Sequence, residues 1–233
     1  ITVKTSCPAR KIERRGEGFA VLTDEGGISA DFVIVSCGGA AGARVGGVHD
    51  GYELLKPLGH KCTRLLPSLV QLITDPTYPR ALKGVRVMAK LRLENDGETL
   101  AQSGGELQFT ETGLSGPAAF DISRAAAKTG RGVIHIDLSG DTDIEYKLRT
   151  RIKNNPALCA DDALTGVLHN RLGKMTVKYA GVPGSMPLDK LTDADIAAIA
   201  NACRDFAIAL RGVEDFYHAQ VTAGGIKTTG VNP

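Results

Sequence analysis

The hydrophobic residues change their spacing near Asp141, and this change limits the possible folds more than any other feature of the sequence. Before Asp141, apolar and polar residues alternate from Val85 to Leu93, and a period of two predicts a half-buried β-strand. After Asp141, apolar residues recur every three or four positions, which is typical of amphipathic helices. We therefore predict a lobe of at least three helices over residues 141–212, separate from a β lobe over roughly residues 68–138.

The third of these helices has the clearest pattern. Thr192 and Asp195 have the spacing of a capping box, with Asp in place of the usual Glu. The apolar residues that follow fall on one helical face, and they are Ile196, Ile199, Ala200, Cys203, Phe206, Ala207 and Leu210. The pattern predicts one helix that ends before Gly212.

Short β-strands are predicted near both ends of the chain. The expected strands are Ile1–Thr5, Pro8–Arg15, Phe19–Thr23, Asp31–Cys37 and Phe216–Thr222. Phe32–Val35 is continuously apolar, which indicates a parallel strand covered on both faces. We expect Ile1–Thr5 and Phe32–Cys37 to share one sheet, and the glycine pairs that follow the last two strands to converge.

The composition is that of an ordinary soluble protein. Of 233 residues, 28 are Lys or Arg and 26 are Asp or Glu, and these charges are scattered, so no DNA partner is expected and RNA has only weak support. The five cysteines show no Cys-x-x-Cys spacing and the histidines do not cluster, so we predict no metal site and a reducing, cytoplasmic location. No apolar run reaches the roughly 18 to 20 residues of a membrane span.

The common catalytic and nucleotide-binding motifs are not found. No Gly-x-Gly-x-x-Gly fingerprint occurs, and Ser115 lies in a turn before Pro117 that favours a helix start over a nucleophile. His135 and Asp137 lie on one side of a predicted strand, which favours a solvated face over a catalytic pair. The sequence therefore identifies no catalytic acid or base, and the catalytic residues are unknown. Asp50 is expected to cap a short helix that ends at Gly59.

Four segments together carry a resemblance to a known family. They are Ala30–Gly39, His49–Tyr52 with Leu58–His60, residues 105–117, and residues 221–226. In their order and in their amino-acid sequence they resemble segments of the two-dinucleotide-fold flavoproteins known as NAD(P)/FAD-dependent oxidoreductases of the aminoacetone oxidase family. The chain departs from that pattern at Ser36-Cys37, where the family has Ala-Thr, and at Val48-His49, where it has small residues.

The resemblance implies an α/β fold with a β-rich insert. A partial FAD/NAD(P)-binding Rossmann-like domain, residues 1–67 and 214–233, is then split by the insert. The insert consists of a β-barrel-like lobe over residues 68–140 and a small helical lobe over residues 141–213. On this interpretation the chain is a central fragment of a longer flavoprotein.

The resemblance also implies the cofactor and its contacts. FAD is the expected cofactor of the full-length parent, with NAD(P)H as a reductant and an unidentified small organic molecule as substrate. The expected flavin-side contacts are Gly38, Gly39, Asp50, Gly51, Thr222, Ala223, Gly224 and Gly225. The chain by itself is expected to be cofactor-free and inactive. Self-association through the strands that end in glycine pairs is an open alternative.

A second interpretation makes the insert a binding module for RNA or for a protein. Arg86, Lys90 and Arg92 would supply a basic β face for such a partner. A solvated strand face explains the same residues, so the two interpretations remain to be separated by experiment.

Overall fold

The chain folds into two compact units. The structure, a computed structural model, describes residues 1–230. One unit is formed by Ile1–Ser68 together with the residues from Asp215 onward, and the other by Leu69–Glu214.

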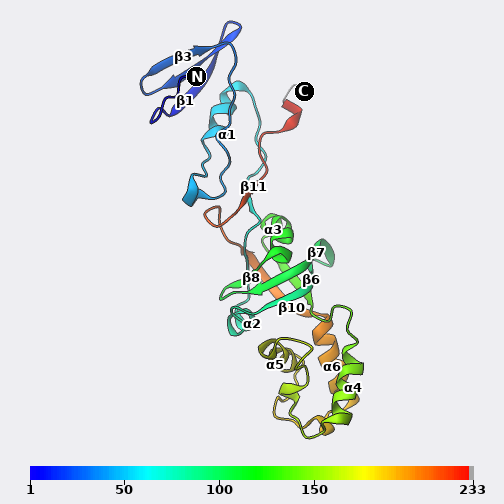
Figure 1. The fold of residues 1–233 in the computed structure, drawn as a ribbon. Helices are drawn as coiled ribbons and strands as arrows, with labels where there is room; N and C mark the ends of the chain where they lie inside the picture. The colour runs from blue at the N-terminus through cyan, green and yellow to red at the C-terminus, as the bar shows by residue number, and fades with distance from the viewer. Residues whose placement is uncertain (231–233) are drawn as a thin grey trace. The chain divides into compact units, whose positions relative to one another are not determined.

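The second unit is built around a closed barrel of six antiparallel strands (Figure 1). The strands are β5 (Leu72–Thr74), β6 (Arg86–Asn95), β7 (Glu98–Phe109), β8 (Gly113–Ser115), β9 (Gly132–Asp137) and β10 (Phe206–Val213). Their order around the barrel is β10-β5-β8-β7-β6-β9. On β6, Leu91 and Leu93 are buried inside while Lys90 is exposed, so the predicted alternation is confirmed.

Two glycines allow the barrel backbone to pack closely around β8. A side chain at Gly113 would place its Cβ 2.0 Å from the carbonyl oxygen of Leu72, and one at Gly116 would come within 2.8 Å of the Glu106 oxygen. Gly116 also has a φ of 93° and precedes α3 (Pro117–Thr129), which ends at Gly130 as predicted. The turn from Gly113 to Pro117 therefore has a structural role in the barrel.

Three α-helices follow β9, so the predicted number of helices is confirmed, but they belong to the same compact unit as the barrel and do not form a separate lobe. They are α4 (Ile144–Asn154), α5 (Asn170–Tyr179) and α6 (Asp193–Arg204), while the shorter α2 (Thr77–Ala81) joins β5 to β6. The capping box at the start of α6 is present, because Asp195 N donates to Thr192 Oγ1 and Thr192 N donates to Asp195 Oδ2.

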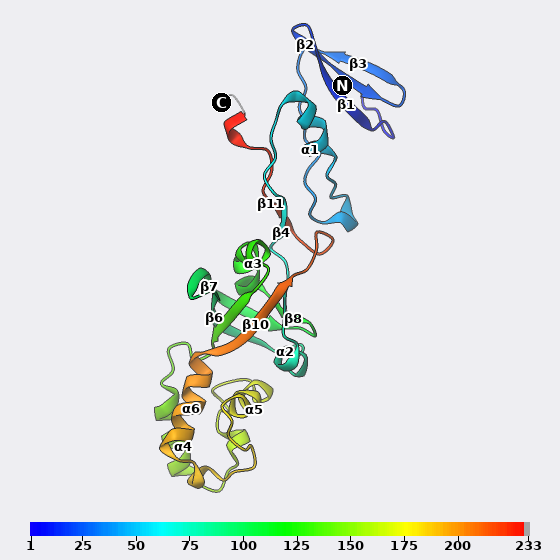
Figure 2. The ribbon, with the colours of Figure 1, turned by 180° about the vertical axis from the view of Figure 1, so that it is seen from behind.

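The predicted end of the third helix is wrong. The helix stops at Arg204, Asp205 adopts φ −146°, and the chain continues as β10, which Figure 2 shows running on from α6 across the barrel. Phe206 pairs with Ile136 of β9 and is fully buried. Helical spacing fits this segment by sequence alone, but antiparallel pairing and burial in the barrel favour a strand.

The barrel and the helices share one hydrophobic core. Tyr78 of α2, Tyr179 of α5 and Phe206 of β10 pack together, and the Tyr179 and Phe206 rings stack with centroids 4.4 Å apart. Ala207 N donates a hydrogen bond to the Tyr179 hydroxyl at 3.1 Å. The helices are thus fixed to the barrel by shared packing as well as by the chain.

The first unit consists of two small sheets and a short helix. Strands β1 (Ala9–Arg15), β2 (Gly18–Thr23) and β3 (Gly26–Ala30) form an antiparallel sheet, and β4 (Leu66–Ser68) pairs with β11 (Val221–Ala223). Helix α1 (Asp50–Leu55) continues into a 3₁₀ turn over Lys56–Leu58 that ends at Gly59 with φ 90°. The predictions for β1, β2 and the short helix are confirmed.

Three details predicted for this unit are wrong. Neither Ile1–Thr5 nor Asp31–Cys37 is a strand, so they share no sheet, and Phe32 and Ile34 are 89% and 90% exposed. No named strand within residues 1–230 pairs in parallel, so Asp31–Cys37 has no ladder to join. His49, rather than Asp50, is the N-terminal cap residue of α1, and its side chain makes no cap hydrogen bond.

The strand predicted over Phe216–Thr222 is shorter, because pairing with β4 begins only at Val221. The Rossmann-like arrangement therefore remains a prediction. None of the helices in residues 1–230 is long and apolar enough to cross a membrane.

Candidate functional site

Gly38–Ala41 and β11 meet in the first unit, and we name this contact the glycine junction. Ala41 N donates a hydrogen bond to Thr222 Oγ1 at 2.8 Å. A Cβ on Gly39 would lie 2.8 Å from Thr222 Oγ1 and 3.1 Å from the Tyr52 hydroxyl. Only glycine lets the main chain approach these two hydroxyl groups so closely.

The loop after the junction is held by main-chain hydrogen bonds. Gly42 N donates to Phe216 O at 2.9 Å, and Val48 N donates to Gly39 O at 3.0 Å. The His49 ring packs edge-on against Phe216, with centroids 5.5 Å apart. Residues more than 160 positions apart in the chain are thereby brought into contact at the junction.

A small polar pocket of about 320 Å³ opens at the junction. It is lined by Gly38, Gly39, Ala41, Tyr52, Gln220 and Thr222. The lining offers main-chain groups, two hydroxyls and an amide, which can hydrogen-bond a carbonyl, hydroxyl or phosphate of a ligand. It contains no carboxylate, histidine, lysine or cysteine, so its residues can bind and orient a ligand but supply no ordinary acid or base.

The structure brings three of the eight predicted contact residues together at this pocket. They are Gly38, Gly39 and Thr222. Gly51 instead lies inside α1, where an added Cβ would come within 3.1 Å of the Cys37 Cβ, so it allows the helix to pack on that segment. Asp50 is exposed at the first position of α1.

The remaining three predicted residues lie along and just after β11. Ala223 pairs with Leu66 in the ladder between β11 and β4. Gly224 has φ 92°, and a Cβ there would lie 2.5 Å from the Arg64 carbonyl oxygen. Gly225 N donates to Thr63 Oγ1 at 3.0 Å, while Thr63 N donates to Gly225 O at 2.8 Å. These contacts fasten β11 to the segment before β4.

Tyr52 and Gln220 line the pocket but were not among the predicted contacts. Gln220 lies at a bend immediately before β11, so the alternation of a strand did not identify it. Tyr52 belongs to the His49–Tyr52 segment of the resemblance, and its phenol is a hydrogen-bonding group that a polar ligand site can use.

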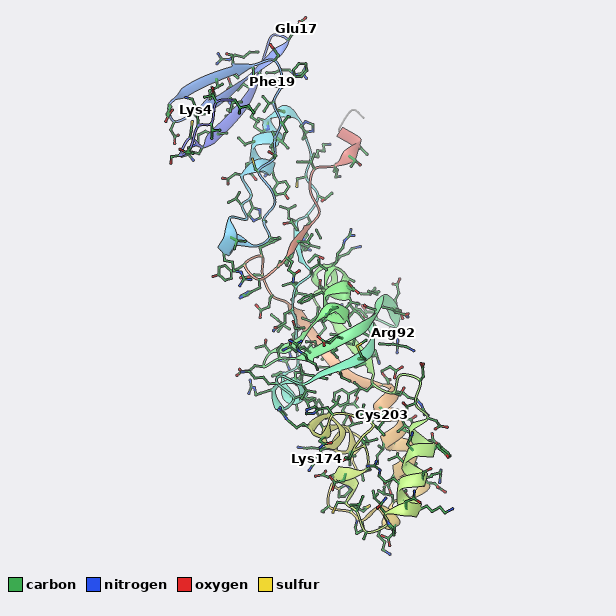
Figure 3. The ribbon with its side chains drawn as sticks, in the orientation of Figure 1. Lys4, Glu17, Phe19, Arg92, Lys174 and Cys203 are labelled. Atoms are coloured by element: carbon green, nitrogen blue, oxygen red, sulfur yellow. The ribbon has the colours of Figure 1, made fainter. Side chains whose placement is uncertain are left out.

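Burial strongly perturbs one thiol away from the glycine junction. The clearest shift is that of Cys203 in α6, labelled in Figure 3, where burial raises the thiol pKa to about 12. Within the described residues, no group of three or more His, Cys, Asp or Glu side chains is placed to hold a metal ion.

Comparison with known proteins gives both a family and relatives. A family model described as the HI0933-like protein barrel and H2TH domain matches residues 66–221, or 156 of the 233 residues. The 3-dehydro-bile acid delta(4,6)-reductase of Clostridium scindens is 28% identical over 240 residues, covering 100% of this chain and 59% of the relative.

Two further relatives are both named ribosomal RNA dihydrouridine synthase. The Escherichia coli protein is 26% identical over 229 residues, which cover 92% of this chain and 55% of the relative. The Haemophilus influenzae protein is 22% identical over 198 residues, which cover 84% of this chain and 48% of the relative. The chain thus spans between about half and three fifths of the length of these relatives. Because the family model covers two thirds of the sequence and its range contains the closed barrel and helices α3 to α6, the chain belongs to the HI0933-like family.

Proposed function

We propose that this chain forms part of an FAD-dependent reductase that acts on an unidentified organic substrate, with NAD(P)H as the source of reducing equivalents. Support comes from the family, from a relative named as a reductase, and from two relatives named as dihydrouridine synthases. The observation that carries the proposal is the convergence at one pocket of Gly38, Gly39 and Thr222, three of the residues that the resemblance implies as flavin contacts.

The junction suits the edge of a flat, polar cofactor. At Gly39 there is no room for a side chain, so a ligand at the pocket meets main-chain groups and the Thr222 and Tyr52 hydroxyls. Gln220 adds an amide that both donates and accepts. We propose that these residues contact FAD, and the other five residues implied by the resemblance stay predictions.

FAD, when bound, supplies the hydride chemistry, and the protein supplies binding and orientation. In this site the hydroxyl of Thr222 already accepts a hydrogen bond from Ala41 N, which fixes its lone pairs and leaves its proton free to be donated. The pocket lining contains no group that exchanges protons at neutral pH, so we assign it a positioning role.

We also propose that the chain alone binds FAD weakly. A dinucleotide pyrophosphate is held mainly by a glycine-rich loop and a helix N-terminus, and the sequence has no Gly-x-Gly-x-x-Gly fingerprint. The few polar groups of the junction must offset an immobilisation cost of about 4 to 15 kcal/mol. The purified chain should therefore be colourless.

A titration of the chain with FAD, followed by flavin fluorescence, tests the proposal. We expect weak, saturable binding that is reduced by Thr222→Val, because the variant keeps the side-chain shape but loses the hydroxyl. Thr5→Val, at an exposed position outside the junction, is the matched control and should bind as the unaltered chain does.

Two results would contradict the proposal. Equal FAD affinity in both threonine variants would show that the glycine junction does not contact FAD. A yellow preparation with stoichiometric flavin would show that other residues hold the cofactor.

RNA binding is the second candidate function, and the names of the dihydrouridine synthase relatives favour it. The β face proposed for RNA is largely neutralised, because Arg86 pairs with Glu106 at 3.3 Å and Arg92 pairs with Glu94. RNA binding through phosphates weakens steeply with salt, so a salt-dependent mobility shift with ribosomal RNA tests this candidate. Absence of a mobility shift at low salt would eliminate RNA binding as a function of this chain.

A further inference from the structure

A pocket of about 660 Å³ lies on the outer face of the barrel, near the end of α6, and we name it the barrel-face pocket. Its lining residues are Lys90, Leu91, Arg92, Gln102, Ser103, Gly104, His135, Asp137, Arg204 and Asp205. All of them belong to the second unit, and Figure 3 labels Arg92 on this part of the barrel. It is separate from the glycine junction, which belongs to the other unit.

The strand register explains why this face is hollow. Two rows of outward-facing residues cross β7, β6 and β9, one formed by Gly104, Lys90 and Asp137 and the next by Gln102, Arg92 and His135. Gly104 has no side chain, so the first row is open beside Lys90. A Cβ at Gly104 would meet only the Lys90 Cγ at 3.8 Å and the Ala89 oxygen at 3.9 Å, which are ordinary contact distances.

The acidic side chains of the pocket already have partners. Asp137 Oδ1 accepts hydrogen bonds from the main-chain N–H and the hydroxyl of Ser139 at 2.8 and 2.5 Å. Asp205 Oδ1 lies 2.6 Å from His135 Nδ1. In each carboxylate the Oδ1 oxygen is thereby engaged within the protein.

Two donors in the pocket, in contrast, lack partners. Within the described residues, Lys90 makes no ion pair or side-chain hydrogen bond, and the Gln102 amide makes none either. Arg204 has only a long contact of 3.5 Å to Glu145. Lys90 therefore places an ammonium group without an ion-pair partner next to a free amide donor and the space above Gly104.

We propose that the barrel-face pocket binds a small acidic molecule through a phosphate or carboxylate group, with Lys90 as the main charged contact. Gln102 donates to the same acidic group, and Arg204 adds a second positive charge at the rim. The methylene groups of Lys90 and Arg92 give the remainder of the ligand an apolar surface. The proposal does not depend on flavin binding.

A small ligand fits this pocket better than RNA. The second unit contains as many acidic as basic residues, 18 of each when residues 69–214 are counted in the sequence. A polyanion needs several unpaired cations along one surface, whereas among the described residues that line this pocket only Lys90 has no ion-pair partner.

Titration of the purified full chain with inorganic phosphate, and separately with succinate, tests the proposal by amide NMR at constant ionic strength. We expect saturable shifts at Gln102 and Gly104 with at least one of these probes. Lys90→Met should weaken that binding by at least about tenfold, the effect of losing a charged hydrogen bond. Lys128→Met removes the same charge from an exposed position on α3 and should change nothing.

Gly104→Leu gives a second, independent test, because it fills the hollow without removing a charge. It should abolish the shifts while leaving the melting temperature nearly unchanged. Saturation by phosphate alone or by succinate alone supports the proposal and identifies the acidic group.

Three outcomes would overturn the proposal. These are shifts that do not saturate or lie elsewhere, equal effects of the two lysine variants, and tighter binding of a short single-stranded RNA than of either probe at the same amides.

Discussion

Gly113 is the residue at which the barrel has least room for a side chain. Because an added Cβ would lie 2.0 Å from the Leu72 carbonyl oxygen, a main-chain atom in the neighbouring strand, Gly113→Ala must push two strands apart. We expect the free energy of unfolding to fall by about 3 kcal/mol, measured by urea denaturation. Gly104→Ala is the matched control and should be nearly neutral, since its Cβ meets only ordinary contacts. Equal losses in the two variants would contradict this account.

The Cys203 thiol should not react with alkylating reagents in the folded protein. Its side chain is fully buried and its pKa is raised to about 12 by burial, so at pH 8 only roughly one molecule in ten thousand carries a thiolate. We expect iodoacetamide to modify the exposed Cys37 and Cys159 and to leave Cys203 unmodified until denaturant is added. Mass spectrometry of the digested protein measures this, and early alkylation of Cys203 would show that α6 opens readily.

Single residues at the glycine junction were only partly predictable from sequence. Glycine pairs after extended segments indicated Gly38 and Gly39, because close backbone approach requires glycine. Tyr52 comes from α1, and its position depends on how that helix packs against Cys37 and the junction loop. Such tertiary packing has no local sequence signal.

At the scale of elements, the start of α6 depends on its capping box. Thr192→Ala removes the hydroxyl that accepts from Asp195 N, and we expect a loss of about 1 kcal/mol in the free energy of unfolding at pH 7. Thr150→Ala, at an exposed position within α4, is the control, and it should be neutral or slightly stabilising because alanine favours helices. Thermal unfolding followed by circular dichroism provides the comparison.

The same cap gives a pH dependence of known sign. Hydrogen bonds from Thr192, first from its side chain and then from its main chain, hold the Asp195 pKa below its ordinary value of 3.8. The stabilisation of the folded protein by the Asp195 carboxylate is therefore complete above about pH 3.8. It is lost as the pH falls through the lower pKa that Asp195 has in the folded state. The difference between the unaltered chain and Thr192→Ala should shrink below that pH, and a constant difference down to pH 2 would contradict the assignment.

Helices and strands marked by a cap, a proline or a hydrophobic period in their own sequence were predicted well. Elements that depend on pairing with a distant strand were not. The cap of α6, Pro117 at the start of α3 and the period of β6 lie within the sequence itself. Phe206 and its neighbours fit a helical face as well as a strand, and only pairing with β9 decides between them. Asp31–Cys37 has an apolar run typical of a buried strand but pairs with no strand within residues 1–230, so composition alone misled the assignment.

At the scale of the whole molecule, the two units should differ strongly in stability. The connected hydrophobic core lies entirely within Leu69–Glu214, whereas few apolar side chains of the other unit are fully buried within the described residues. We expect slow hydrogen exchange for the barrel strands and α6, and fast exchange for β1–β3, as measured by mass spectrometry of peptides. Equal protection in the two units would show that residues 1–68 are held by contacts beyond those of their own unit.

The direct pairing of β9 with β10 has a consequence for how this family can vary. Helices α4, α5 and α6 lie between two neighbouring antiparallel strands, so topologically they form the loop of a β-hairpin, although that loop is 68 residues long from Leu138 to Asp205. The cost in chain entropy of closing a loop rises only with the logarithm of its length, so insertions there add little to that cost. The barrel can therefore keep its register while the sequence between Leu138 and Asp205 diverges, provided that residues such as Tyr179 still pack against Phe206.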